Sequence, residues 1–118
     1  MQHVYTHKEQ FQHKSVIELG SGVGILGLFM CRYCRQFTFT DGNKSTLKVL
    51  QHNLTLNDVP KNIQIRLLRW EDPIEQEIQH KFDIVVGTEL MYKQAALPHV
   101  FKAAAGLLSS SADARVIM

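Results

Sequence analysis

Hydrophobic residues in this chain fall into short apolar runs, which alternate with longer stretches where apolar and polar positions mix. The short runs contain β-branched and aromatic residues, which favour strands. The longer stretches can place their apolar residues on one side of a helix. We therefore predict strands at residues 15–19, 36–40, 63–68, 82–87 and 115–118, and helices at 22–34, at 45–57 and from Pro98 to about residue 108.

This order of elements predicts an α/β fold, a Rossmann-like doubly wound parallel sheet with helices on both faces. The run at 82–87, F-D-I-V-V-G, is typical of a parallel strand that is buried on both faces. With 118 residues, the chain is expected to form a single domain, residues 1–118. Ligands of such sheets bind beyond the carboxyl ends of the strands, so a candidate site is expected beside the first strand.

Residues 16–27 read V-I-E-L-G-S-G-V-G-I-L-G, which is a strand end, a glycine-rich turn and the start of a helix. Because glycine lacks Cβ, the backbone can turn sharply there and a ligand can approach the main chain closely. The spacing Gly22-x-Gly24-x-x-Gly27 satisfies the dinucleotide-binding pattern, and Asp41 after the second strand could hold ribose hydroxyls. This match alone leaves an NAD-dependent oxidoreductase open.

Glu18, directly before the glycines, changes the choice of cofactor. A carboxylate at this position would repel a pyrophosphate that docks on the helix N-terminus. The same carboxylate would suit a ligand with an ammonium group. S-adenosylmethionine carries an ammonium, a sulfonium and a ribose, and it has no phosphate. Glu18 and Asp41 together therefore favour S-adenosylmethionine over NAD.

Composition narrows the classes of partner. The net charge of +2 argues against nucleic acid or an anionic membrane as the main partner, and no apolar run approaches the roughly 20 residues of a membrane span. Cys31 and Cys34 form a lone C-x-x-C pair, too few ligands for a zinc site, whereas their spacing suits one face of a helix. No metal is predicted. Free cysteines without an export signal predict a cytoplasmic protein, with the nucleus as a second compartment.

Four motifs of the chain resemble the motifs of a known family. E-L-G-S-G-V-G at 18–24 is similar to the first motif of the class I, seven-strand methyltransferases that use S-adenosylmethionine. T-D-G-N at 40–43, L-R-W-E-D at 68–72 and F-D-I-V-V-G-T-E-L-M-Y at 82–92 resemble the motifs of the protein-lysine methyltransferase branch. The combination of D-G-N with L-R-W particularly resembles calmodulin-lysine methyltransferases.

The resemblance implies roles at the cofactor. Glu18 and three glycines would hold its methionine end, Asp41 would accept bonds from the ribose hydroxyls, and Trp70 would stack beside the adenine. Asn43 would assist Asp41. For each of these residues a purely structural role stays open. The glycines would then serve packing only, Asp41 would be a turn or cap residue, Asn43 would start the following helix, and Trp70 would be an aromatic plug under the loop. The predicted cofactor-binding residues are Glu18, Gly20, Gly22, Gly24, Asp41, Asn43, Trp70 and Thr88.

The branch also carries an acid-x-x-aromatic motif after the fourth strand, which Glu89 and Tyr92 match. The resemblance implies that these two are the catalytic residues. Glu89 would orient the incoming lysine ammonium, and Tyr92 would face the cationic sulfonium. A solvated loop acid is the alternative for Glu89. The implied partner is a protein substrate with an acceptor lysine, and the identity of that protein is left open.

The family has seven strands and an amino-terminal extension that helps cover the cofactor. Five predicted strands, and a glycine motif close to Met1, predict a truncated class I core without the C-terminal strands. Substrate contacts often come from those ends. A catalytically inactive cofactor-binding or adaptor domain therefore stays open beside the methyltransferase.

Overall fold

The structure is a computed structural model and describes residues 8–87 and 97–117. Five strands in these ranges form one sheet in the order β3-β2-β1-β4-β5, and each neighbouring pair is parallel. They are β1 (Ser15–Leu19), β2 (Gln36–Asp41), β3 (Ile63–Leu67), β4 (Ile84–Gly87) and β5 (Arg115–Ile117). The predicted parallel sheet is confirmed. Its order reverses at β1, so the carboxyl ends of β1 and β4 mark the topological switch point.

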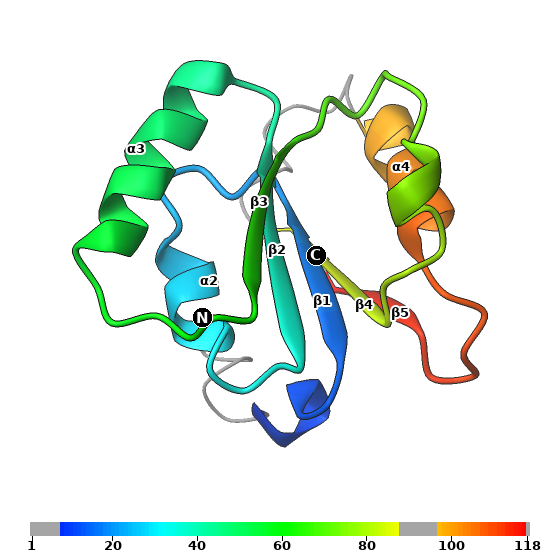
Figure 1. Cartoon of the computed structure of the whole chain (residues 1–118). Helices are drawn as coiled ribbons and strands as arrows, with labels where there is room; N and C mark the ends of the chain where they lie inside the picture. The colour runs from blue at the N-terminus through cyan, green and yellow to red at the C-terminus, as the bar shows by residue number, and fades with distance from the viewer. Residues whose placement is uncertain (1–7, 88–96, 118) are drawn as a thin grey trace.

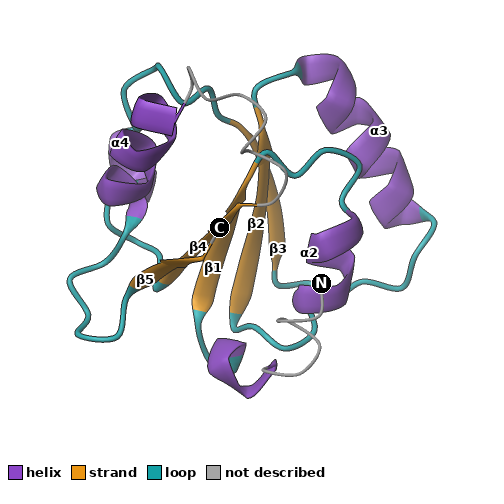
Figure 2. Cartoon of the chain, turned by 180° about the vertical axis from the view of Figure 1, so that it is seen from behind, coloured by secondary structure: helices purple, strands orange, loops and turns teal. Residues whose placement is uncertain are grey.

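Helices cover both faces of the sheet, as Figures 1 and 2 show. α2 (Ile25–Met30) and α3 (Lys44–Thr55) lie on one face. α4 (Leu97–Leu107) lies on the other, near the short 3-10 helix η2 (Gln76–Ile78). A second 3-10 helix, η1 (Lys8–Phe11), lies at the amino ends of the strands.

Two apolar clusters hold these layers together. Under α2 and α3, the rings of Phe37 and Phe39 from β2 meet edge to face with centroids 4.7 Å apart, and Leu26, Met30 and Leu50 pack with them. On the other face, Ile17 and Leu19 of β1 and Val85 of β4 pack in one cluster with side chains of α4, which are Val100, Ala104 and Leu107. All five residues of β1 are buried, so this strand is the centre of the molecule.

The first helix is shorter than predicted. Residues 22–34 were expected to be helical, whereas α2 covers only Ile25–Met30. Gly22 and Gly24 have φ values of +58° and +93°, which lie outside the right-handed helical region, so they belong to the loop. Residues 31–34 form turns. The first strand has the predicted bounds, and the other predicted boundaries differ from the observed ones by at most two residues.

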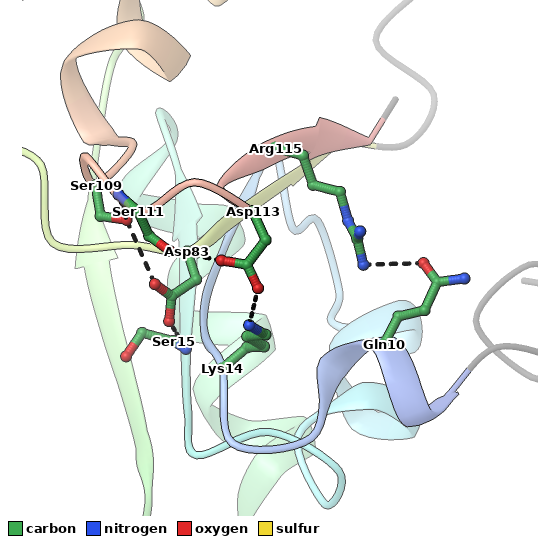
Figure 3. A network of polar contacts seen from close by, with 8 residues as sticks. All are labelled: Gln10, Lys14, Ser15, Asp83, Ser109, Ser111, Asp113 and Arg115. Atoms are coloured by element: carbon green, nitrogen blue, oxygen red, sulfur yellow. Dashed lines mark hydrogen bonds and ion pairs between the residues drawn. The ribbon is translucent and has the colours of Figure 1, made fainter.

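Polar contacts tie the strands together at the amino end of the sheet (Figure 3). Asp83, just before β4, accepts the Ser15 backbone N–H at 3.0 Å, and the Ser109 hydroxyl donates to it at 3.4 Å. Lys14 forms an ion pair with Asp113 in the loop before β5. Arg115 Nη2 donates to Gln10 Oε1 of η1 at 3.0 Å. This end of the sheet is braced by side chains that belong to no predicted site.

Cys31 and Cys34 are free and buried, in the cluster under α2. Burial raises the pKa of both thiols, and for Cys34, with the neighbouring Cys31 adding to the effect, to about 12. The pair therefore packs, as predicted, although it lies at and beyond the end of α2. In the described ranges no three potential ligands are grouped so that they could hold a metal ion. None of the helices described there is long and apolar enough to cross a bilayer.

Candidate functional site

The loop at residues 20–24 joins β1 to α2 at the carboxyl end of the sheet, the upper end in Figure 1. Gly20, Gly22 and Gly24 take φ values of +70°, +58° and +93°. Side chains with a Cβ atom are strained at such values, so the backbone path itself calls for glycine at these positions. Gly24 is the N-cap of α2, so the loop leads directly into the N-terminus of that helix.

The glycines of this motif have two different surroundings. A Cβ atom on Gly24 would lie 2.4 Å from Leu50 Cδ1 of α3, and one on Gly27 would lie 2.1 Å from Phe39 Cε1 of β2. These two glycines allow the helices to pack closely on each other and on the sheet. A Cβ atom on Gly22 would meet no atom of the described residues within 4 Å. Gly22 therefore exposes main chain that a ligand can approach.

Three sets of contacts fix the shape of the loop. Ser21 exchanges two hydrogen bonds with Thr40 of β2, because its N–H donates to the Thr40 carbonyl at 2.7 Å and its hydroxyl accepts the Thr40 N–H at 3.0 Å. The Gly22 N–H donates to Asp41 Oδ2 at 3.1 Å. Asn53 of α3 donates from Nδ2 to the Val23 carbonyl at 3.0 Å. The loop is thus held in place from β2 and from α3.

Glu18 lies on β1 directly below this loop and is 1% exposed. Its nearest strand neighbours are apolar, Phe39 on β2 and Val86 on β4. Burial raises the pKa of its carboxyl, a hydrogen bond with Ser21 lowers it in part, and the charge of Asp41 raises it, which together give a pKa of about 8. Its Oε1 atom has no hydrogen-bond partner among the described residues. The surroundings of Glu18 therefore favour the neutral carboxyl, so the charge expected of it from the sequence requires a partner that stabilises the ionised form.

Asp41 ends β2 and is half-buried. Besides the Gly22 N–H, its carboxylate accepts the Asn43 N–H at 3.0 Å. A carboxylate has about four acceptor positions, so these two contacts leave room for hydroxyl donors. Asp41 lies two residues beyond Phe39, the register partner of Glu18, and its carboxylate holds the loop that follows Glu18. The structure thus brings the two predicted acids together beside the glycine loop.

Asn43 is the N-cap of α3, and its Oδ1 accepts the N–H groups of Ser45 and Thr46 at 2.8 and 3.1 Å. This is the helix-start alternative that the sequence left open. Trp70 is half-buried and packs with Ile74 against the cluster under α4, as an aromatic plug would. For both residues the contact with a cofactor stays a prediction.

Thr88, Glu89 and Tyr92 lie outside the described residues. They follow Gly87, whose register partner on β1 is Leu19. Their roles stay predictions.

Ser21, Leu50 and Asn53 also shape the site, and sequence reasoning did not single them out. Ser21 occupies the variable position between two glycines of the motif, where the pattern carries no requirement. Leu50 and Asn53 are three residues apart, which places them on neighbouring turns of one helix face. That spacing was visible in the sequence, but the packing of α3 against the loop was not.

A surface hollow at η2, lined by Glu75, Gln76 and Glu77, is separate from this site. Arg66 of β3 bonds Glu75 at 3.4 Å and Glu77 at 3.0 Å, so these charges are already paired.

Comparison with known proteins identifies the family. The sequence matches the profile of a family described as lysine methyltransferase over residues 1–118. The chain belongs to the lysine methyltransferase family. The resemblance found in the four motifs is therefore confirmed, with S-adenosylmethionine as the methyl donor at the level of the family. The family does not favour the NAD-dependent oxidoreductase alternative.

Curated relatives of this chain are named as lysine methyltransferases. Human protein-lysine N-methyltransferase EEF2KMT is 28% identical over 102 residues, which cover 74% of this chain and 31% of the relative. Protein N-lysine methyltransferase METTL21A of Danio rerio is 28% identical over 115 residues, 94% of this chain and 51% of the relative. Calmodulin-lysine N-methyltransferase of Arabidopsis thaliana is 28% identical over 71% of this chain and 29% of the relative. The chain thus spans about a third to a half of these relatives.

Solved structures confirm the fold. Protein arginine methyltransferase 10 of Arabidopsis thaliana superimposes with a TM-score of 0.74 at 18% identity, covering 92% of this chain and 31% of that one. An S-adenosylmethionine-dependent methyltransferase of Mesorhizobium loti gives a TM-score of 0.66 at 13% identity, covering 83% and 42%. The Rossmann-like methyltransferase fold predicted from the sequence is therefore correct.

The residues present fit S-adenosylmethionine. Open space at Gly22 allows close approach to the main chain, and Asp41 retains acceptor capacity for ribose hydroxyls. The Oε1 atom of Glu18, which has no hydrogen-bond partner among the described residues, offers an acceptor for an ammonium group. A polyphosphate would instead place its negative charge next to Asp41.

Proposed function

We propose that this chain forms the cofactor-binding core of a protein-lysine N-methyltransferase that uses S-adenosylmethionine. The observation that carries the proposal is the juxtaposition of Glu18, Asp41 and the open Gly22 at the switch point of a sheet that belongs to the lysine methyltransferase family. The methyltransferase names of the relatives support the same activity.

Each part of the loop then has a task at the cofactor. Gly20, Gly22 and Gly24 bring the main chain close to the methionine end, and Glu18 attracts its ammonium group. Asp41 accepts hydrogen bonds from the ribose hydroxyls while it holds the Gly22 N–H, so ribose binding and loop shape depend on one carboxylate. Ser21, Thr40 and Asn53 keep the loop in this shape before binding, which lowers the entropy cost of binding.

Bound S-adenosylmethionine supplies an electrophilic methyl group on its sulfonium. Glu89 and Tyr92 are proposed to receive the acceptor lysine there, Glu89 by orienting its ammonium and Tyr92 by facing positive charge with its ring. A lysine must lose a proton before its amine can attack, and an apolar channel lowers its pKa. Much of the rate then comes from positioning, because the nucleophile and leaving group are both good.

The proposed partner is a protein with an accessible lysine. A cytoplasmic protein, also present in the nucleus, fits the two reduced thiols.

A titration followed by Trp70 fluorescence tests cofactor binding, because Trp70 is the single tryptophan of the chain. S-adenosylhomocysteine should bind and NADH should not. Asp41→Asn should raise the Kd of S-adenosylhomocysteine about tenfold or more, since a charge-assisted hydrogen bond is lost. Asp58→Asn is the matched control, because Asp58 is exposed and follows α3 at the other end of the sheet. Tight binding of NADH alone would overturn the proposal.

Methyl transfer needs a separate assay. Labelled S-adenosylmethionine and a protein extract should give label on lysine side chains. Glu89→Gln should lower transfer without changing the Kd of S-adenosylhomocysteine, whereas Glu71→Gln, which changes an exposed loop acid, should alter neither. Cofactor binding without transfer to any protein would indicate the inactive binding domain instead.

A further inference from the structure

Glu18 is an acid on the central strand of the sheet, with 1% of its surface exposed. Its main chain is fixed on both sides, because β1 pairs with β2 and with β4 in this region. The Thr40 hydroxyl also donates to the Glu18 carbonyl at 2.6 Å. The side chain therefore has little freedom to turn toward water. Any change in its charge has to be stabilised by what lies beside it.

The groups that face Glu18 are known for each described element around it. β2 contributes Phe39 at the level of Glu18 and the Asp41 carboxylate at its end, and β4 contributes Val86. The loop contributes the Ser21 hydroxyl. Glu89, beyond β4, lies outside the described residues. Of these described groups, only Ser21 favours the ionised carboxyl, while burial and Asp41 oppose it.

One carboxyl oxygen is left without a partner. Oε1 is buried and makes no hydrogen bond with any described residue, although it lies below the loop whose Gly22 faces open space. A buried acceptor without a donor is costly, and an ionised one costs more. An ammonium group from a ligand would supply both the missing donor and a compensating charge.

We propose that the Glu18 carboxyl gives up a proton to solvent when a ligand with an ammonium group binds beside it. This inference rests on the proposed function, because the ammonium is that of the methionine end of S-adenosylmethionine. One proton leaves the protein for each ion pair that forms between the Glu18 carboxylate and the ligand ammonium. Glu18 changes from neutral acid to carboxylate, the proton leaves to the buffer, and the ligand ammonium keeps its own protons.

A measurable pH dependence follows. Below about pH 8, where the free protein holds the proton on Glu18, binding has to displace it. The affinity for an ammonium ligand should therefore rise about tenfold for each pH unit toward pH 8. Between about pH 6 and 7 the ligand amine stays protonated, since α-amino groups titrate near pH 8, so Glu18 dominates the change.

Isothermal titration calorimetry in two buffers of different ionisation enthalpy counts the protons released on binding. The ligands are S-adenosylhomocysteine and 5′-methylthioadenosine, which shares the adenosine and the thioether sulfur but lacks the amino-acid end. The proteins are the parent and Glu18→Gln, whose amide resembles the neutral acid in shape. We expect S-adenosylhomocysteine to release about one proton from the parent. Glu18→Gln should release none and bind with a Kd that no longer depends on pH in this interval. 5′-Methylthioadenosine should release none from either protein.

Two results would overturn the inference while the proposed function stands. One is tight binding of S-adenosylhomocysteine to the parent without proton release. The other is equal proton release from Glu18→Gln, which would assign the proton to another group. If Glu18→Gln does not fold, the two ligands can still be compared on the parent protein. Equal proton release with both ligands would contradict a role for the ammonium group. A parent protein that binds neither ligand refutes the proposed function itself, and the inference with it.

Discussion

Glu18→Gln replaces a buried carboxyl by a neutral amide of nearly the same shape, and its effect on stability depends on pH. Burial, with the nearby Asp41 charge and against the Ser21 hydrogen bond, raises the pKa of the folded carboxyl from 4.5 to about 8. In the unfolded chain the group ionises near its ordinary value. Between the two values the folded protein holds a proton that the unfolded chain has lost, so the free energy of unfolding falls as pH rises.

The size of the effect follows from the same values. Each pH unit within the interval costs about 1.4 kcal/mol. From pH 4.5 to about pH 8 the parent should lose on the order of 5 kcal/mol of stability relative to Glu18→Gln. Below pH 4.5 and above about pH 8 the difference between the two proteins should stay constant, because the carboxyl then has the same protonation in both states.

Urea unfolding, followed by far-ultraviolet circular dichroism at a series of pH values, measures this difference. Glu71→Gln is the matched control, since it makes the same change at an exposed loop position. We expect the midpoint of the parent to fall with pH relative to that of Glu18→Gln, while the control follows the parent. Parallel curves for the parent and Glu18→Gln would instead show that burial does not hold a proton on Glu18.

Three further predictions concern packing and the loop. Gly27→Ala should destabilise the fold strongly, because its Cβ would lie 2.1 Å from Phe39 Cε1. Gly22→Ala should cost only about 1–2 kcal/mol of backbone strain and yet weaken S-adenosylhomocysteine binding. Thermal unfolding measures the losses of stability and calorimetry the losses of binding, and equal losses of stability in the two variants would contradict this prediction. Asn53→Ala should raise the Kd of S-adenosylhomocysteine several-fold, because it frees the Val23 carbonyl of the loop. Asn57→Ala removes a similar hydrogen bond to a helix carbonyl and should leave this Kd unchanged. Equal changes of Kd in the two variants would argue against a role for Asn53 in the loop. Cys31 and Cys34 should react slowly with a thiol reagent in the folded protein and rapidly in urea, because both thiols are buried and burial raises their pKa. Rapid reaction without denaturant would show that the core under α2 is open.

Elements with a strong local pattern were predictable from the sequence. β1 has the predicted bounds, because an apolar run followed by glycines leaves little choice of where the strand ends. The parallel sheet followed from the alternation of strands and helices. The N-terminus of α2 was not predicted, because its apolar pattern continues back into glycines whose backbone is left-handed. Periodicity does not report the sign of φ.

The candidate site was predictable in its residues but not in its electrostatics. The positions of Glu18 and Asp41 at strand ends were sufficient to bring them together at one edge of the sheet. Their charges were not predictable, because the ionisation of Glu18 depends on how completely β2, β4 and the loop exclude water from it. The roles of Ser21 and Asn53 depend on contacts across the fold, so they became visible only in the structure.

We propose that the Gly20–Gly24 loop, Glu18 and Asp41 together bind S-adenosylmethionine. An experimental structure of the protein with S-adenosylhomocysteine would show whether they do. We expect ribose hydroxyls on the Asp41 carboxylate, the amino-acid end of the ligand above Glu18, and ligand atoms in the open space beside Gly22. A ligand bound away from the glycine loop, or a ribose that makes no contact with Asp41, would contradict it.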